Sequence, residues 1–234
     1  MEGVASLEQK MLAVDCLKAM KESMTFRELS KETKISAGIL NRYLNGRILP
    51  KDKRATEILD MFYENYLQQI VAKESRMKES KYIVTTGILS QPFLLKIIAF
   101  RIKSYFSGKV DRILTAAVDG IPLAILTAEL YGAKSVYAKK TQELTFSSYY
   151  TSKKEEHKPL ISPFYLPKDM LKRNDNILIV DDVVRGGSTM NALLNICEQA
   201  RANILGIYAI FITRSAYKSL SKKFTVRYLF LIND

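Results

Sequence analysis

ILIVDDVVRGGSTMNAL, residues 177–193, contains a short apolar run, two adjacent aspartates and an Arg-Gly-Gly-Ser-Thr loop that leads into an apolar-periodic segment. The run Ile177–Val180 predicts a buried parallel strand, and ligands bind at the carboxyl ends of such strands. Asp181 and Asp182 follow directly, so we expect them to point into a crevice. There they need ribose hydroxyls, a metal ion or basic groups opposite, because unpartnered buried carboxylates are costly.

The loop after the two acids has the composition of a phosphate-binding loop. Gly186 and Gly187 free backbone N–H groups to turn inward, Ser188 and Thr189 add hydroxyls, and a helix N-terminus is expected next. Acids for sugar hydroxyls beside a cradle for phosphate predict a site for a phosphorylated ribose.

The segments around this stretch alternate between strand and helix patterns. Such alternation predicts parallel pairing and an α/β fold with a mainly parallel, doubly wound sheet. The expected strands are 112–118, 135–138, 177–180, 204–213 and 226–232, and the expected helices are 92–106, 121–131 and 188–201. The long polar segment 139–168, with three prolines, interrupts the pattern and indicates a functional flap.

The first 80 residues show no convincing strand pattern and predict a small all-α unit. We therefore divide the chain into a DNA-binding domain (1–60), a charged helical connector (61–81) and an α/β ligand-binding domain (82–234). Between Met24 and Arg54, eight Lys or Arg residues stand against three Asp or Glu residues. This local excess of positive charge indicates an anionic partner.

Within the basic segment, residues 24–50 predict two short helices separated by a turn. Thr25 and Glu28 form a capping-box pattern, and Ser36 is a favourable N-cap for the second helix. That helix should bury Ile39, Leu40, Tyr43 and Leu44 and present small and polar residues outward, as a helix that enters the major groove of double-stranded DNA must. The candidate DNA-binding residues are Thr25, Lys34, Ser36, Ala37, Gly38, Asn41, Arg42, Asn45 and Arg47. A helical hairpin that only packs or dimerises is the structural alternative.

Composition limits the remaining function classes. The net charge of +12 suits nucleic acid or nucleotide phosphates, although a lysine-rich solubilising surface would give the same value. No apolar stretch is long enough to cross a bilayer, and the N-terminus lacks the order of a signal peptide, so we expect a cytoplasmic protein without a membrane partner. Cys16 and Cys197 are expected to be free, packed thiols.

The stretch 177–193 resembles the ribose-phosphate signature of the type I phosphoribosyltransferases. The resemblance implies that Asp181 and Asp182 hold the ribose 2- and 3-hydroxyls and that the loop wraps the 5-phosphate. The ribose- and phosphate-binding residues that the resemblance implies are Asp181, Asp182, Val184, Arg185, Gly186, Gly187, Ser188 and Thr189. LTAAVDGIPLAIL, residues 114–126, resembles the family's pyrophosphate loop and adds Ala117, Val118, Asp119, Gly120, Lys139 and Lys140. The implied cofactor is Mg²⁺ bound together with phosphoribosyl pyrophosphate, with no metal held by the protein alone.

Three positions depart from the family pattern. Arg185 stands where purine-type members often have an aspartate or a small residue, and an arginine cannot take up the proton of the base. Gly186 replaces a threonine and removes a hydroxyl from the cradle. Asp119 stands where orotate-type members tend to have a lysine, so it repels pyrophosphate unless a metal ion intervenes. Binding tolerates these changes better than turnover does.

The combination of a helical DNA-reading unit with such a domain resembles two kinds of transcription regulator. Bacterial purine repressors use a winged helix, whereas the archaeal regulators of glucose and fructose catabolism are similar over both the helix-turn-helix stretch and residues 164–189. The resemblance implies a homodimer that binds a palindromic operator and senses phosphoribosyl pyrophosphate or a nucleotide. The alternative is an active purine or orotate phosphoribosyltransferase whose helical appendage serves dimerisation.

Overall fold

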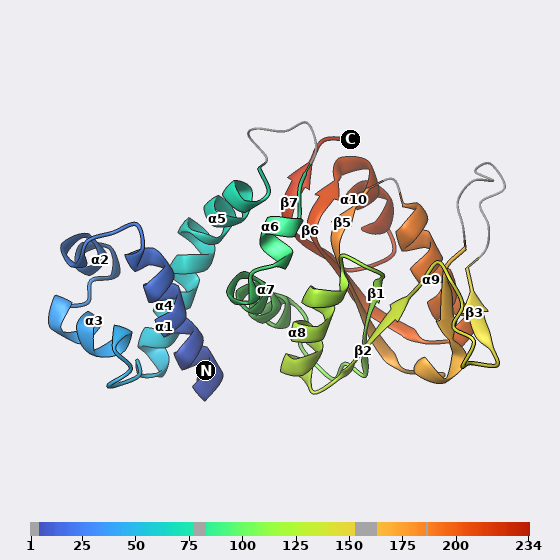
Figure 1. The fold of residues 1–234 in the computed structure, drawn as a ribbon, viewed down its shortest axis with the longest axis horizontal. Helices are drawn as coiled ribbons and strands as arrows, with labels where there is room; N and C mark the ends of the chain where they lie inside the picture. The colour runs from blue at the N-terminus through green and yellow to red at the C-terminus, as the bar shows by residue number, and fades with distance from the viewer. Residues whose placement is uncertain (1–4, 77–82, 153–162, 186) are drawn as a thin grey trace. The chain divides into compact units, whose positions relative to one another are not determined.

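The computed structural model describes residues 5–76, 83–152, 163–185 and 187–234. The chain forms two compact units, Met1–Val84 and Thr85–Asp234, which Figure 1 shows as ribbons. Within the described ranges, none of the helices combines the length and apolar character needed to cross a bilayer.

The first unit is built of helices around a small apolar core. Its helices are α1 (Leu7–Lys21), α2 (Phe26–Thr33), α3 (Ala37–Leu44), α4 (Asp52–Asn65) and α5 (Leu67–Glu74). A capping box starts α2, because the Thr25 hydroxyl accepts from the Glu28 N–H while the Glu28 carboxylate accepts from the Thr25 N–H. The fully buried Leu29 and Leu40 anchor α2 and α3 to this core.

The second unit is an α/β unit with a five-stranded parallel sheet, as its strand and helix alternation predicts. The strand order is β2-β1-β5-β6-β7, and every neighbouring pair is parallel. The strands are β1 (Arg112–Ala116), β2 (Lys134–Ala138), β5 (Asn176–Val184), β6 (Asn203–Thr213) and β7 (Val226–Ile232). The helices are α6 (Thr86–Leu89), α7 (Pro92–Tyr105), α8 (Ile121–Tyr131), α9 (Ser188–Ala200) and α10 (Arg214–Leu220).

The strand order fixes where a ligand can enter the sheet. From β1 the chain crosses through α8 to β2 on one side, and from β5 it crosses through α9 to β6 on the other side. Right-handed crossovers then place α8 and α9 on opposite faces, as Figure 1 shows. The topological switch point therefore lies between β1 and β5, and ligands of open α/β sheets bind at such a point.

Two strand boundaries differ from the predicted ones. β5 continues through Val184 instead of ending at Val180, so the two aspartates lie within the second half of the strand. β1 ends at Ala116 instead of continuing to Val118, whose side chain is 74% exposed. Pairing with the neighbouring strand sets both boundaries, because β5 stays paired with β6 as far as Val184 and β1 with β2 only as far as Ala116.

Part of the predicted flap forms a short antiparallel ribbon. Tyr149–Thr151 (β3) pairs with Tyr165–Pro167 (β4), and the 3-10 turn Lys168–Met170 follows. Strands of three residues are too short to show an alternating pattern in the sequence. Residues 153–162, which include Lys153, Lys154 and His157, lie outside the described ranges.

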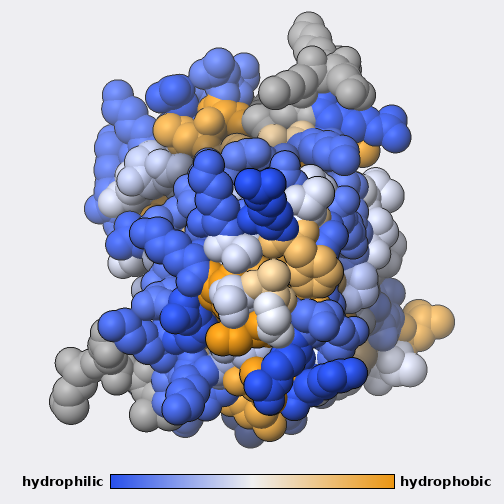
Figure 2. Space-filling model, turned by 90° about the vertical axis from the view of Figure 1, so that its left-hand side faces the viewer, coloured by the Kyte–Doolittle hydropathy of each residue, from blue (hydrophilic) through white to orange (hydrophobic). Residues whose placement is uncertain are grey.

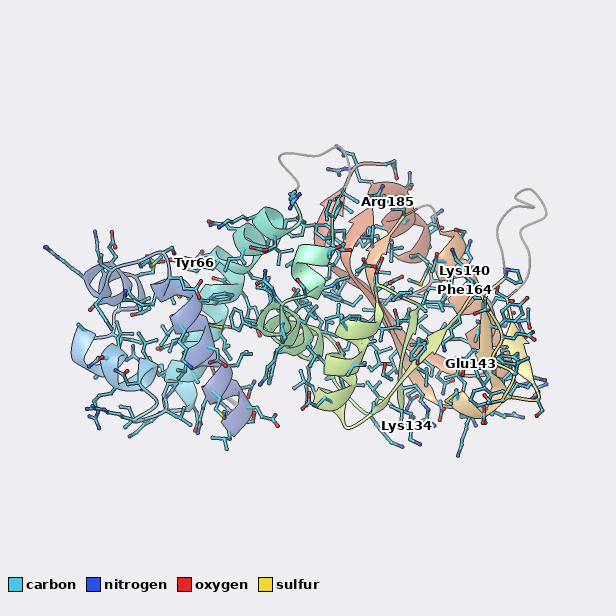
Figure 3. The ribbon with its side chains drawn as sticks, viewed as in Figure 1. Tyr66, Lys134, Lys140, Glu143, Phe164 and Arg185 are labelled. Carbon is cyan, nitrogen blue, oxygen red and sulfur yellow. The ribbon has the colours of Figure 1, made fainter. Side chains whose placement is uncertain are left out.

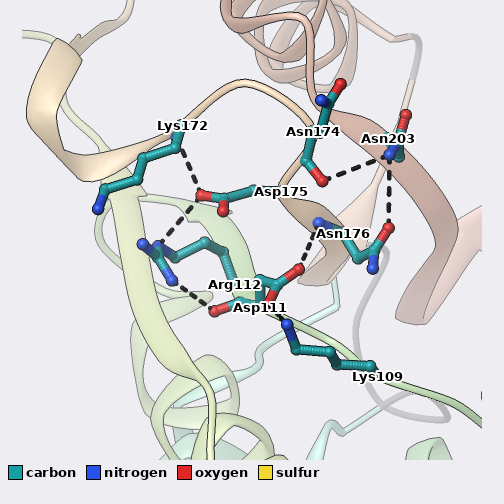
Figure 4. A network of polar contacts seen from close by, with 8 residues as sticks. All are labelled: Lys109, Asp111, Arg112, Lys172, Asn174, Asp175, Asn176 and Asn203. Atoms are coloured by element: carbon teal, nitrogen blue, oxygen red, sulfur yellow. Dashed lines mark hydrogen bonds and ion pairs between the residues drawn. The ribbon is translucent and has the colours of Figure 1, made fainter.

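A polar network joins the amino ends of three strands of the sheet (Figure 4). The carboxylate of Asp111, just before β1, accepts the Asn176 N–H of β5 at 3.0 Å and pairs with Lys109 at 2.9 Å. The Asn176 N–H, with help from Lys109, holds the pKa of Asp111 below its usual value. Asn203 of β6 donates its side-chain amide to Asn176 at 3.5 Å. The network thus fixes the strand register at the end of the sheet opposite the expected site.

Gly206 allows close packing between β6 and the end of α7. A Cβ atom at this position would lie 2.1 Å from Cε1 of the buried Phe106 ring. We expect Gly206→Ala to lower the free energy of unfolding by about 1–3 kcal/mol, because the ring has to move in a packed core. Urea unfolding followed by circular dichroism measures the change.

Gly38→Ala is the control, since a Cβ there meets nothing within 4 Å. A double-mutant cycle with Phe106→Leu should recover part of the loss, because the smaller side chain yields to the new methyl group. A Gly206→Ala variant as stable as the wild type would show that the ring contact does not constrain this position.

Candidate functional site

The two aspartates lie side by side at the carboxyl end of β5, next to the switch point. Their side chains are 6% and 7% exposed, and the Asp182 N–H donates to Oδ1 of Asp181 at 3.1 Å. Burial, with the nearby Asp182 carboxylate as the second cause, raises the pKa of Asp181 well above its usual value. The pair is therefore poorly compensated within the chain and is suited to external hydroxyls or a cation.

The loop after β1 reaches this acid pair. A Cβ at Gly120 would lie 1.9 Å from Oγ1 of Thr115 and 2.7 Å from Oδ1 of Asp181, so only glycine fits. The Ala117–Val118 peptide bond of this loop is cis. Asp119 is exposed and contributes to the raised pKa of Asp181. The structure thus brings the predicted pyrophosphate loop, residues 117–120, to the predicted ribose-binding acids.

The second loop leads from β5 into α9. Arg185 is exposed, Gly187 has a φ of 90°, and Ser188 and Thr189 form the half-buried first turn of the helix. Gly186 lies outside the described residues. No side chain caps the N-terminus of α9, so its first N–H groups and its dipole are available to an anion. Val184, the last residue of β5, is buried below the loop.

The two lysines predicted to contact pyrophosphate have partners elsewhere. The ammonium of Lys139 pairs with Glu143 and lies 5.2 Å from the centre of the Tyr137 ring. The hydrogen bond to Glu143 raises the pKa of Lys139. Lys140 lies 5.9 Å from the ring centre of Phe164, beside which it appears in Figure 3. Neither lysine contacts the acid pair in an interaction that the structure shows.

The carboxylates suit magnesium held jointly with phosphate groups. Mg²⁺ commonly binds through one or two carboxylates and substrate phosphates, and Asp181, Asp182 and Asp119 are the carboxylates that could hold it here. Among the residues that the structure describes, no group of three or more His, Cys, Asp or Glu side chains is placed to hold a metal ion alone.

The predicted DNA-binding residues are exposed on α3, on the turns before and after it, and at the N-cap of α2. Exposed residues are Thr25, Lys34, Ser36, Ala37, Gly38, Asn41, Arg42, Asn45 and Arg47. Leu40 and Tyr43 are buried as predicted, whereas Ile39, also predicted to be inward, is 41% exposed, because neighbouring side chains on a helix point about 100° apart. Thr25 also has a structural role, since its hydroxyl is engaged in the capping box.

Two details affect the chemistry of α3. The amide of Asn45 donates to Oδ1 of Asn41 at 2.7 Å, which fixes the Asn41 side chain and leaves its NH₂ group to donate outward. Lys34 ends α2 in the left-handed conformation, with φ 54°, and so sets the turn. Figure 2, which looks at the side carrying α2 and α3, shows a mostly hydrophilic surface with small apolar areas.

Thr115 is a site residue that sequence reasoning missed. It is fully buried in β1, and its hydroxyl is the nearest atom to the position that a Gly120 side chain would occupy. The sequence does contain one indication, because Thr115 is a hydroxyl residue in the apolar run that precedes the Gly120 loop. Its contact with the loop depends on the backbone path, which the pattern does not specify.

Comparisons with known proteins agree with this geometry. The family model described as the phosphoribosyl transferase domain matches residues 87–232. The chain is 30% identical over 166 residues to the purine biosynthesis transcriptional repressor PurR of Bacillus subtilis, covering 69% of this chain and 56% of that protein. It is 31% identical over 151 residues to a xanthine phosphoribosyltransferase of Alkaliphilus metalliredigens, covering 60% of this chain and 72% of that enzyme. The chain thus spans less than two thirds of the length of the regulators that it matches.

Solved structures support the same fold. Adenine phosphoribosyltransferase of Leishmania tarentolae superposes with a TM-score of 0.59 at 17% identity, covering 72% of this chain and 88% of that one. The Saccharomyces cerevisiae enzyme superposes with a TM-score of 0.54 at 21% identity, covering 69% and 99%. By its family match, its parallel sheet and the two loops that meet at the switch point, this chain belongs to the phosphoribosyl transferase domain family.

Proposed function

We propose that this protein is a DNA-binding transcription regulator whose phosphoribosyltransferase-like unit senses phosphoribosyl pyrophosphate or a nucleotide. The observation that carries the proposal is the contact of the Gly120 loop with Asp181 beside an uncapped helix N-terminus. The similarity to purine biosynthesis regulators supports the regulatory class. The exposed polar side of α3 supports DNA as the partner.

The crevice chemistry favours a phosphorylated ribose. Ribose hydroxyls would donate to Asp181 and Asp182, which have few donors of their own. The N-terminus of α9, from Ser188 onward, would bind the 5-phosphate through N–H groups, while the Gly120 loop would bind the pyrophosphate. Mg²⁺ bound with the ligand would neutralise the repulsion between pyrophosphate and Asp119.

Arg185 is the main reason to propose sensing in preference to turnover. Phosphoribosyl transfer to a purine requires a group that handles the proton of the base, and a guanidinium remains charged at physiological pH. Arg185 instead adds an exposed positive charge next to the phosphate loop, which favours anion binding. An active phosphoribosyltransferase is the second candidate, because xanthine phosphoribosyltransferases are among the relatives.

DNA binding is proposed for the α2–turn–α3 segment as a helix-turn-helix. Asn41 and Arg42 would reach base edges or phosphates from α3, and Lys34 and Arg47 would contact phosphates on either side. A homodimer would place two such segments on a palindromic operator. The ligand would change their spacing only to the extent that it binds the two dimer states with different affinity. We propose more specifically that the protein is a regulator of the archaeal glucose and fructose type. Identification of its operator sequence tests this assignment.

Asp181→Asn should stabilise the ligand-free protein at pH 7 while abolishing its response to ligand. The raised pKa of Asp181 means that ionisation opposes folding above the unfolded-state pKa of about 4. We expect the melting temperature to rise by about 2–4 °C, as for roughly 1 kcal/mol in a chain of this length. Phosphoribosyl pyrophosphate with Mg²⁺ should stabilise only the wild type.

The advantage of the asparagine variant should shrink as the pH falls towards about 4, because Asp181 then takes up its proton in the native state and its ionisation no longer opposes folding. Asp169→Asn, at an exposed carboxylate of the same unit, is the matched control and should change neither the melting temperature nor its rise with ligand. A thermal shift with ligand that survives in Asp181→Asn would remove the acid pair from the proposed site.

Binding of the protein to its own promoter should depend on α3. Arg42→Ala and Asn41→Ala should each weaken binding in a gel-shift assay about tenfold or more, as expected for a lost base or phosphate contact. Affinity should fall steeply between 50 and 200 mM salt, because phosphate contacts release counterions. Lys222→Ala removes an exposed cation of the α/β unit and is the control. Unchanged binding by both α3 variants would refute the recognition-helix assignment.

Turnover is tested by incubating radiolabelled adenine, xanthine or orotate with phosphoribosyl pyrophosphate and Mg²⁺. We expect no nucleotide above background, with an active phosphoribosyltransferase assayed in parallel as the positive control. Clear product with any base would establish the second candidate function and show that Arg185 does not prevent proton handling.

A further inference from the structure

Asn41 and Asn45 lie one turn apart on the exposed side of α3 and at its C-cap. With Ala37 they follow one another at four-residue spacing, which puts the three side chains in one column of the helix surface. Ala37 carries only a methyl group, so a partner can come close to Asn41 from the N-terminal side. The column is therefore accessible to the base edges of a major groove.

The orientation of both side-chain amides is fixed within this pair. The Asn45 NH₂ group donates to the backbone carbonyl of Asn41 at 2.9 Å and to the Asn41 side-chain oxygen at 2.7 Å. A backbone carbonyl can only accept, so the atom of Asn45 that faces it must be the nitrogen. The atom of Asn41 that faces the same NH₂ group must then be its oxygen. The Asn41 NH₂ group consequently points away from Asn45, and no residue that the structure describes accepts from it.

Backbone hydrogen bonds hold Asn45 in this position. Its N–H donates to the Asn41 carbonyl at 3.1 Å, and Gly46 ends the helix with a left-handed φ of 67°. The Arg47 N–H then closes the turn on the carbonyl of Arg42 at 2.9 Å. Because these bonds fix the end of α3, the amide pair is preformed before a partner binds.

The charges around the pair suit a polyanion. From Thr33 to Lys51 the chain has four Lys or Arg residues and no Asp or Glu. Lys34, Arg42 and Arg47 of this segment are exposed. The segment thus contributes no carboxylate that would accept from the Asn41 NH₂ group or repel the phosphates of DNA.

We propose that Asn41, held by Asn45, reads a guanine of the operator through a contact in which Asn41 only donates, an inference that rests on the proposed DNA-binding function. Asparagine commonly reads adenine by accepting from N6 and donating to N7, but here the oxygen is turned to Asn45. The two hydrogens of the NH₂ group match the N7 and O6 acceptors of guanine instead. Cytosine presents an amino group at this edge, and adenine presents one beside N7, so both bases place a donor against a donor.

Selection of binding sites from a randomised duplex pool, with the full-length protein, tests the inference. Gel-shift titrations then compare all four bases at each position of the selected site. The position read by Asn41 is the one at which Asn41→Ala no longer discriminates between bases. We expect the wild type to prefer guanine over adenine there about tenfold or more. Asn45→Ala should remove most of this preference, because the released Asn41 amide can rotate and offer its oxygen to adenine.

A second measurement uses 7-deazaguanine at that position, which removes the N7 acceptor and keeps the base pair. The analogue should weaken binding by the wild type about fivefold through loss of one hydrogen bond, and it should have little effect on Asn41→Ala. Asn65→Ala, at an exposed asparagine of α4, is the matched control and should keep the wild-type base preference. Circular dichroism establishes that each variant is folded.

A base other than guanine preferred at the Asn41 position overturns the inference. It is also overturned if Asn45→Ala keeps the full guanine preference, or if Asn41→Ala keeps every base preference of the wild type. In the first two cases the DNA-binding part of the proposed function would still stand. Absence of any sequence-specific binding would instead refute that function, and this inference with it.

Discussion

The close approach of Gly120 to Asp181 is the constraint on which the candidate site depends. The parallel pairing of β1 with β5 puts the two strand ends next to each other, but a side chain at position 120 would collide with Thr115 and with the carboxylate. Glycine removes that collision and lets α8 begin directly beside the acid pair. The ribose, phosphate and pyrophosphate elements can then act on one ligand, because the backbones that carry them meet at one point.

This arrangement has an electrostatic cost in the ligand-free protein. Asp181 is buried beside Asp182, and Asp119 adds a third carboxylate, so the pKa of Asp181 is raised. A chain selected only for stability would place an amide or an apolar side chain here. The network at the amino ends of β1, β5 and β6, with its paired Asp111, holds the strands in register at the other end of the sheet. The unfavourable electrostatic energy of the acid pair is thus offset by stabilising contacts at the amino ends of the strands.

The sequence predicts the sheet well and the site only in part. Apolar runs locate all five strands of the sheet, and the Asp-Asp and glycine-loop patterns identify which strand ends matter. What the pattern does not specify is backbone path and side-chain direction. Thr115 becomes a neighbour of Gly120 through the path of one loop. Lys139 pairs with Glu143, four residues away, and contacts the Tyr137 ring. Ile39 lies just outside the buried face of α3 that Leu40 and Tyr43 form. Short ribbons such as β3–β4 give no periodic signal.

Sensing and catalysis make different demands on the same crevice. Groups that bind the ground state and the transition state of a ligand equally supply affinity without rate, as contacts to the 5-phosphate far from the reacting carbon do. In the proposed site, the acid pair, the Gly120 loop and the N-terminus of α9 would do this, and the fold itself positions them. Rate requires, in addition, a group that moves a proton at the base, and at Arg185, where the resemblance to purine-type members implies such a group, the chain carries a permanent cation. A sensor needs only the first set, because its response depends on how differently two conformations bind the ligand.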